Sequence, residues 1–181
     1  MRNAGKRSHR RFHMHALYLF SVWLHIIAAM TWIGGMLFLV TVIVPMLRQP
    51  SMRDRAMELF HMLGVRFRRV GWIAIFSLLV TGVFNLLRRG YELHQVWTGA
   101  VFAGTWGHLL AGKLLLVALI VISSALHDFY VGPTATRLAR EGASPERRER
   151  LRRLASWMGR TTLLLALAVV AIAVMLVRGT P

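Results

Sequence analysis

Four long apolar runs separated by arginine-rich segments predict an all-α integral membrane protein, a four-helix bundle with amphipathic helices at the membrane interface. Hydrophobic residues make up 56% of the 181 residues, and the mean hydropathy is +0.52. Soluble domains contain about 45–50% apolar residues. Because hydrocarbon excludes charge while the membrane flanks favour it, this block pattern is typical of membrane-spanning helices. The length favours a single transmembrane domain over residues 1–181, and no internal repeat is visible.

The apolar runs set the expected helices, since about 20 apolar residues span a bilayer. The first expected helix has no formal charge, and Pro45 lies near its end. The third contains Lys113, and arginines follow the second and the fourth. A basic tail over residues 1–15 precedes the first helix. The expected spans are residues 18–47, 70–87, 103–127 and 161–177.

Two of the connections carry the pattern of amphipathic helices. Residues 51–69 place apolar side chains on one helical stripe, with arginine and glutamate elsewhere. In the connection before the fourth span, Ser144-Pro145-Glu146 is a helix-start signal, because it joins a capping side chain, a first-turn proline and an acid near the positive end of the dipole. We expect both segments to lie in the membrane interface. A solvated charged loop is the alternative.

The formal net charge of +16 comes from arginines beside the apolar runs rather than from a basic folded face. Such arginines pair with anionic lipid head groups, so the expected partner is the lipid bilayer and not nucleic acid. Fourteen Lys and Arg residues fall on one side of the expected membrane and eight on the other. The positive-inside rule then puts both termini outside the cytoplasm, although the basic tail argues for the reverse.

The absence of several motifs limits the chemistry. The chain has no cysteine, which excludes disulfides, thiolate metal sites, iron–sulfur clusters and cysteine nucleophiles. It has no G-x-S-x-G, P-loop or H-E-x-x-H motif. Two acidic residues, Glu92 and Asp128, lie at the edges of the expected spans. These features disfavour hydrolysis inside the bilayer and favour a role other than that of an enzyme.

Histidines gather at two depths, because successive helices cross the membrane in opposite directions. The residues expected toward one face are His25, Asn85, His94 and His108, and those expected toward the other are His61 and His127. An imidazole within the bilayer is costly, so His25 should face the interior of the bundle. Two roles stay open for it: a partner of a backbone carbonyl, Trp or Thr, or a ligand.

The helical face that carries His25 is lined by small residues and one tryptophan. Small side chains let a neighbouring backbone, or a flat cofactor, come close. The face consists of His25, Ala28, Ala29, Trp32, Gly35 and Met36.

A polar seam runs along the third span toward its His127 end. At about 100° per residue, its members lie within roughly 40° of one line. An intramembrane lysine is a functional candidate, although its four-carbon stem also lets Lys113 snorkel to the interface. His108 lies about 140° away from Lys113 and cannot serve the same partner from the same face. The seam consists of Lys113, Val117, Ile120, Ser124 and His127.

The start of the first span, from Leu24 to Gly35, reads LHIIAAMTWIGG and carries an H-x-x-A-x-x-x-W-x-G-G pattern. It resembles the CopD-type family of bacterial inner-membrane proteins, which is linked to copper resistance or copper import. The resemblance covers residues 18–135 and implies a multi-pass protein of the bacterial inner (plasma) membrane. Three further stretches fit it: Phe67-Arg68-Arg69-Val70 leading into Thr81-Gly82-Val83, Gly112-Lys113-Leu114-Leu115, and His127-Asp128-Phe129 followed by Gly132-Pro133.

The same start and the lysine of the third span are also similar to HemJ-type membrane proteins. That family is implicated in protoporphyrinogen oxidation and is associated with haem b. The Arg and Tyr-His that follow its first helix are absent, since this chain reads Val44-Pro45-Met46-Leu47-Arg48.

The CopD-like resemblance favours copper handling or transport as the function. His25, Met30 and Met36 would be relay ligands for Cu(I), which favours soft or imidazole donors, and His108 is a further metal candidate. Further functional candidates are Lys113, Trp32 and Ser124.

Two other functions compete with copper handling. A haem b-binding cytochrome or haem-linked oxidoreductase would clamp the iron axially between His25 and His108, and His61 with His127 would form a second site. The other is a non-catalytic subunit that packs against larger membrane subunits. Copper and haem b are therefore the two candidate cofactors.

Overall fold

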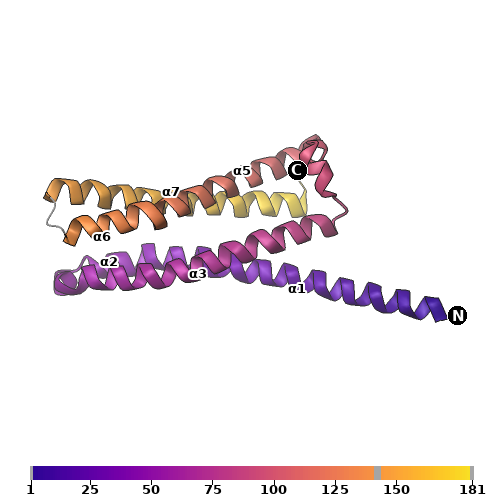
Figure 1. The fold of residues 1–181 in the computed structure, drawn as a ribbon, viewed down its shortest axis with the longest axis horizontal. Helices are drawn as coiled ribbons and strands as arrows, with labels where there is room; N and C mark the ends of the chain where they lie inside the picture. The colour runs from indigo at the N-terminus through magenta and orange to yellow at the C-terminus, as the bar shows by residue number, and fades with distance from the viewer. Residues whose placement is uncertain (1, 141–143, 180–181) are drawn as a thin grey trace. The chain divides into compact units, whose positions relative to one another are not determined.

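The computed structural model describes residues 2–140 and 144–179, and over that part the chain folds into helices joined by short connections (Figure 1). Four of these helices are long and apolar enough to cross a membrane, which confirms the predicted all-α membrane fold. The candidate spans are His13–Leu47, Glu58–Arg88, Gly104–Ala135 and Pro145–Arg178. Between 11% and 22% of the most apolar stretch of each is buried, as expected for helices whose outer faces meet lipid.

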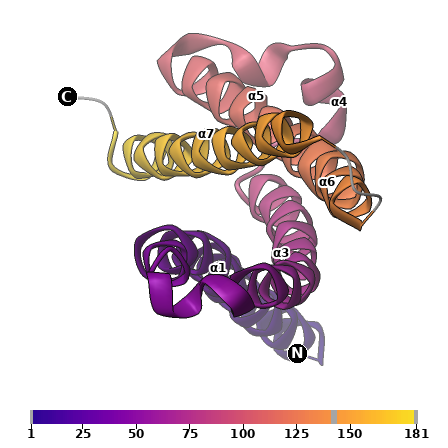
Figure 2. The ribbon, with the colours of Figure 1, turned by 90° about the vertical axis from the view of Figure 1, so that its left-hand side faces the viewer.

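The helices form two compact units, unit 1 over residues 1–98 and unit 2 over residues 99–181. In unit 1, α1 packs against α3, and in unit 2, α5 packs against α7 (Figure 2). Unit 1 contains α1 (Arg2–Phe38), the π-helical segment η1 (Leu39–Ile43), α2 (Val44–Leu47), the 3-10 turn η2 (Pro50–Met52), α3 (Arg53–Arg88) and α4 (Leu93–Trp97). Unit 2 contains the 3-10 turn η3 (Ala100–Phe102), α5 (Gly104–Leu126), the π-helical segment η4 (His127–Val131), α6 (Gly132–Arg140) and α7 (Pro145–Arg178).

The first span is continuous from α1 through η1 to α2. The helix itself begins at Arg2, within residues 1–15 that the sequence indicated as a tail, whereas the apolar span within it runs from His13 to Leu47. Pro45 accounts for the π-helical segment just before it. Proline has no N–H to donate, and its ring collides with the carbonyl four residues earlier, so the helix widens at this point. The hydroxyl of Thr41, within η1, donates to the carbonyl oxygen of Leu37 at 2.7 Å.

The two amphipathic segments are the first halves of long helices and not separate elements. Both α3 and α7 run unbroken from the arginine-rich half into the apolar half. At 1.5 Å per residue, α3 is about 54 Å long, which exceeds the roughly 30 Å of hydrocarbon in a bilayer. The charged first half of α3 can therefore extend beyond the hydrocarbon. The start of α7 at Pro145 agrees with the helix-start signal, although the side chain of Ser144 makes no capping hydrogen bond.

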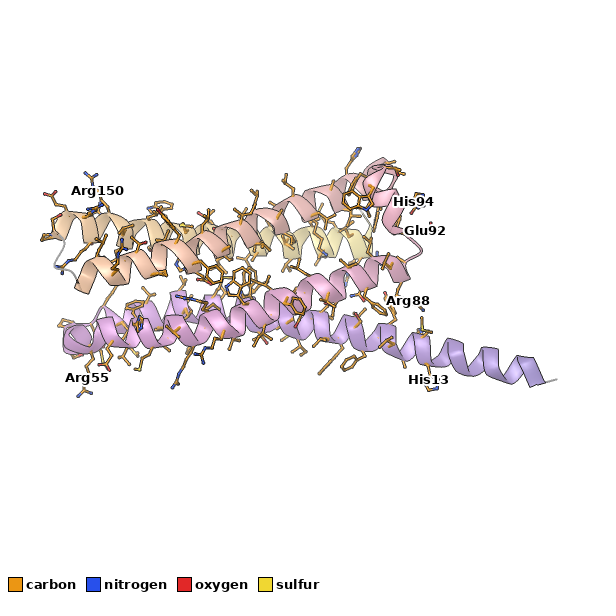
Figure 3. All side chains as sticks on the ribbon, viewed as in Figure 1. His13, Arg55, Arg88, Glu92, His94 and Arg150 are labelled. Carbon is orange, nitrogen blue, oxygen red and sulfur yellow. The ribbon has the colours of Figure 1, made fainter. Side chains whose placement is uncertain are left out.

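Charged side chains mark both ends of α3 in unit 1. Figure 3 shows Arg55 near its first turn and Arg88 near its last. Beyond that end, Glu92 opens α4 with a capping box and forms an ion pair with His94, whose Nδ1 lies 3.1 Å from Oε2. The apolar stretch between the charged ends is the part of α3 suited to hydrocarbon.

Units 1 and 2 have the same order of elements, although their side chains do not reveal a repeat. Each contains a π-helical segment that ends two residues before a proline, Pro45 in unit 1 and Pro133 in unit 2. The number of residues from η1 to η4 equals the number from Pro45 to Pro133. The same number of residues separates Gly71 of α3 from Gly159 of α7. A helix, a widened turn, a proline and a return helix therefore recur along the chain at a constant spacing.

Candidate functional site

His25 of α1 is hydrogen-bonded to Thr81 of α3, with 2.7 Å between Nδ1 and Oγ1. The sequence left open whether this imidazole would have a polar protein partner or serve as a ligand, and the structure supplies a threonine partner. Thr81 is buried and His25 is partly buried. The bond therefore lies where α1 and α3 pack together, and the histidine side chain faces the interior of its unit.

The hydroxyl of Thr81 fixes which ring nitrogen of His25 carries the proton. Thr81 Oγ1 lies 2.5 Å from the carbonyl oxygen of Ser77 and donates its single hydrogen there. It must then accept from the imidazole, so the neutral ring carries its proton on Nδ1. The lone pair is on Nε2, which is the nitrogen able to coordinate a metal ion. A Cβ on Gly82 would lie 3.5 Å from Cε1 of His25, so glycine leaves room beside the ring.

Glycines let α1 and α3 approach closely beyond this bond. Trp32 is only 6% exposed, and its ring would lie 3.5 Å from a Cβ on Gly71. At Gly35, a Cβ would collide with the ring of Phe67. Later residues of α1 contact earlier residues of α3, so the two helices are antiparallel. The small-residue face predicted around His25 is therefore the face that packs against α3.

Two buried oxygens lie one helical turn from the His25–Thr81 pair. Ser21 precedes His25 by one turn of α1, and Asn85 follows Thr81 by one turn of α3, so each shares a face with its neighbour. Because the helices are antiparallel, both oxygens lie toward the same end of the pair. Ser21 Oγ and Asn85 Oδ1 are shielded from solvent and have no hydrogen-bond partner among the described residues. The sequence put Asn85 at the depth of His25 and placed Thr81 in a stretch that fits the family resemblance, but it assigned neither Thr81 nor Ser21 to the site.

The α5–α7 pair of unit 2 has polar contacts of its own. Ser123 Oγ and Thr162 Oγ1 lie 2.9 Å apart, and Trp106 Nε1 donates to the carbonyl oxygen of Leu176 at 3.3 Å. Ser124, which the polar seam singled out, is partly buried beside the serine that makes the contact. The predicted polar seam included Ser124 because Ser124 lies on the same line of the helix as Lys113. The residue that contacts α7 is the neighbouring Ser123.

The other candidates of unit 2 lie along the same span. His127, in η4, has its Nδ1 2.9 Å from Oδ1 of Asp128. The side chain of His108 is exposed, and that of Lys113 is partly buried. The interval that separates the two prolines also separates His25 from Lys113, so Lys113 occupies the position in unit 2 that the histidine occupies in unit 1.

The remaining candidates of unit 1 lie apart from His25. His61 is exposed on α3, and Met30 is 65% exposed on α1. Met36 is partly buried on α1, but at 1.5 Å per residue it lies about 16 Å from His25 along the helix axis. Met36 and His25 therefore cannot bind the same ion. Within residues 2–140 and 144–179, no group of three or more His, Cys, Asp or Glu side chains is arranged to hold a metal ion.

Comparison with known proteins identifies the family. The family described as copper resistance protein D, CopD, matches residues 61–176, which take in most of α3 and nearly all of unit 2. A curated relative from Aquifex aeolicus (strain VF5), itself described as an uncharacterized protein, is 32% identical over 167 residues, which cover 89% of this chain and 94% of the relative. No solved structure matches the chain. The protein is therefore a multi-pass membrane protein that belongs to the copper resistance protein D family.

Proposed function

We propose that the protein handles copper within the membrane and that His25 is a ligand of the copper ion. Membership of the copper resistance family supports copper as the cargo. The observation that carries the proposal is the 2.7 Å bond from His25 Nδ1 to Thr81, because it assigns the lone pair to Nε2. An imidazole nitrogen is a favourable ligand for copper.

Thr81 is the positioning residue in this proposal. A metal-bound histidine almost always donates its other N–H to an oxygen, which fixes the tautomer and the orientation of the ring. Thr81 supplies that oxygen, and its hydroxyl is itself held by the carbonyl oxygen of Ser77. The ring is therefore oriented before an ion arrives, and little rotational freedom is lost on binding.

Met36 and His108 are the other proposed copper ligands, each as a separate station. Met36 lies on the same helix as His25 at a distance of about 16 Å along its axis, and its thioether suits Cu(I). His108 presents an exposed imidazole on α5. Donors dispersed along the helices suit stepwise passage of an ion better than storage in one closed cage. Lys113, Trp32 and Ser124 stay functional candidates without an assigned step.

The copper content of the detergent-purified full chain tests this proposal. After incubation with copper and removal of unbound ion, we expect stoichiometric metal in the wild type and a large loss in His25→Ala. His94→Ala is the matched control, because His94 is exposed and paired with Glu92 outside the apolar stretch of α3. Equal copper content in the wild type and His25→Ala would remove His25 from the site.

A haem b-binding role is the alternative, and the same lone pair on Nε2 favours it. Haem iron also takes an axial imidazole nitrogen, which His25 would supply through Nε2. The visible spectrum of the purified protein separates the two functions. A Soret band that shifts on reduction with dithionite would favour haem, whereas a colourless protein that binds copper would eliminate it.

A further inference from the structure

Arg68 of α3 carries a positive charge that has no partner among residues 2–140 and 144–179. Its guanidinium makes no hydrogen bond or ion pair to any residue that the structure describes. Its Nε is shielded from solvent, so this N–H loses its contact with water without gaining a protein acceptor. Buried polar groups usually have a partner, and an unmade hydrogen bond from a charged group is costly. Arg68 therefore indicates an acceptor that the described chain does not supply.

The acidic residues of unit 1 lie too far from Arg68 to neutralise it. Residues 1–53 contain no aspartate or glutamate, so α1, which packs against α3, offers no carboxylate. On α3 the nearest acid is Glu58, which lies about 15 Å from Arg68 along the helix axis. The next acid in the chain is Glu92, beyond the other end of α3. The anion that Arg68 lacks is therefore not a side chain of unit 1.

Arg68 lies where α3 enters the apolar part of its span. The uncharged stretch of α3 covers residues 70–87, and Arg88 follows it near the last turn of the helix (Figure 3). At 1.5 Å per residue this stretch is about 27 Å long, close to the roughly 30 Å of hydrocarbon in a bilayer. Arg68 is therefore at the level of the lipid head groups, where phosphate is the abundant anion, whichever way the chain is oriented.

The surroundings of Arg68 suit a phosphate that carries no cation of its own. Arg66 and Arg69 are exposed and place two further positive charges within two residues of it. These charges repel the ammonium of a zwitterionic head group. A Cβ on Gly64, one turn earlier on the same side of α3, would meet nothing within 4 Å, so this side of the helix is open to a head group.

We infer that Arg68 binds the phosphate of an anionic phospholipid, of the phosphatidylglycerol class, at this end of α3. The terminal N–H groups of the guanidinium are not shielded and meet the phosphate first. A small movement of the side chain then brings Nε–H onto a second oxygen, because the planar fork of arginine matches two phosphate oxygens. Arg68 lies about 20 Å from Thr81 along α3, so the lipid site does not depend on the proposed copper ligand.

Native mass spectrometry of the full chain in detergent tests the inference. We titrate the protein with phosphatidylglycerol and, separately, with phosphatidylcholine, and expect the wild type to bind phosphatidylglycerol more tightly. Arg68→Ala should raise the dissociation constant of phosphatidylglycerol about tenfold or more, because charge-assisted hydrogen bonds are lost. Arg69→Ala is the matched control, since it removes the same charge at the same depth, and its effect should be smaller. Equal losses in the two variants would mean that diffuse charge attracts the lipid, which would overturn a site at Arg68.

Thermal unfolding separates lipid binding from a structural role of Arg68. In lipid-free detergent, Arg68→Ala should unfold at the wild-type midpoint or above it, because the substitution removes an unsatisfied donor. Added phosphatidylglycerol should raise the midpoint of the wild type, since a ligand of the folded state stabilises it, and should leave that of Arg68→Ala unchanged. A lower midpoint of Arg68→Ala without lipid would mean that the arginine stabilises the protein by itself, and the inference would fail.

Inorganic phosphate distinguishes a lipid from a soluble anion. A large excess should not displace phosphatidylglycerol from the wild type, because the acyl chains also bury apolar surface against the protein. Complete displacement by phosphate would mean that the site takes a free anion, which would overturn the lipid assignment. Either failure leaves the copper proposal standing, since the copper content of His25→Ala is measured independently.

Discussion

Nδ1 of His25 and Oγ1 of Thr81 lie 2.7 Å apart, although the residues are 56 positions apart in the chain. The bond has two consequences that follow from the same geometry. It joins α1 to α3 inside unit 1, and it determines the tautomer, because the hydroxyl hydrogen of Thr81 already binds the carbonyl oxygen of Ser77. Packing of the helix pair and preparation of the metal ligand therefore depend on one threonine.

Replacement of Thr81 by valine should weaken copper binding without removing the ligand. Thr81→Val keeps the shape of the side chain but deletes the acceptor for Nδ1–H, so the imidazole is no longer held in one tautomer. Loss of such an outer partner typically lowers metal affinity about 10–100-fold. Titration of the purified protein with copper measures the change, and nitrogen NMR of labelled histidine reports the tautomer.

Thr81→Ser separates the hydrogen bond from packing. Serine keeps the hydroxyl and loses one methyl group, so it should retain the Nδ1–H tautomer and most of the copper affinity. If Thr81→Ser and Thr81→Val lose affinity equally, packing rather than the hydrogen bond positions the ring.

A large side chain at Gly35 should separate α1 from α3, whereas one at Gly34 should not. A Cβ at Gly35 would collide with the ring of Phe67, but nothing lies within 4 Å of a Cβ at Gly34. Overpacking typically costs about 1–3 kcal/mol, and a substitution away from contacts stays within roughly 0.5 kcal/mol. Thermal unfolding in detergent should therefore show a lower midpoint for Gly35→Leu than for Gly34→Leu. Equal midpoints would contradict the close approach of the two helices.

The contact between Ser123 and Thr162 should contribute to the stability of unit 2. The two hydroxyls lie 2.9 Å apart and join α5 to α7. Side-chain hydrogen bonds between membrane helices contribute about 0.6 kcal/mol on average and up to about 1.7 kcal/mol. A double-mutant cycle with Ser123→Ala and Thr162→Val should give a coupling energy in this range. Strictly additive effects would mean that the two hydroxyls do not stabilise each other.

The membrane class and the four spans could be predicted because they depend on local transfer energy. Each apolar run is cheaper to place in lipid than in water, and no tertiary contact is needed to decide this. The continuity of α3 could not be predicted in the same way. Charge marks where the hydrocarbon ends, but a helix can continue past that point, and residues 53–88 contain no proline to stop it.

The candidate site was only partly predictable, because a partner across two helices depends on their register. Parity of the spans places Asn85 at the depth of His25, and the sequence allows a threonine as the partner of this imidazole. Nothing in the sequence paired Thr81 with His25, since a shift of α3 by one turn would bring another residue to the imidazole. The oxygen of Ser21 was missed for a related reason: its burial becomes visible only once α1 and α3 are packed together.

The orientation of the chain can be tested with single cysteines, because the natural sequence contains none and gives no background labelling. With fourteen Lys and Arg residues on the proposed cytoplasmic side against eight on the other, both termini should lie outside the cytoplasm. Thr98 would then lie outside, whereas Ser51 and Ser156 would lie inside, and all three side chains are exposed. A membrane-impermeant maleimide added to intact cells should label Thr98→Cys and leave Ser51→Cys and Ser156→Cys unlabelled until the membrane is opened.

The reverse pattern would mean that the basic segment before the first span, and not the two large basic connections, sets the topology. It would also put His25 toward the cytoplasmic side, since His25 and Thr98 lie toward the same end of unit 1, and copper would then reach this ligand from inside the cell.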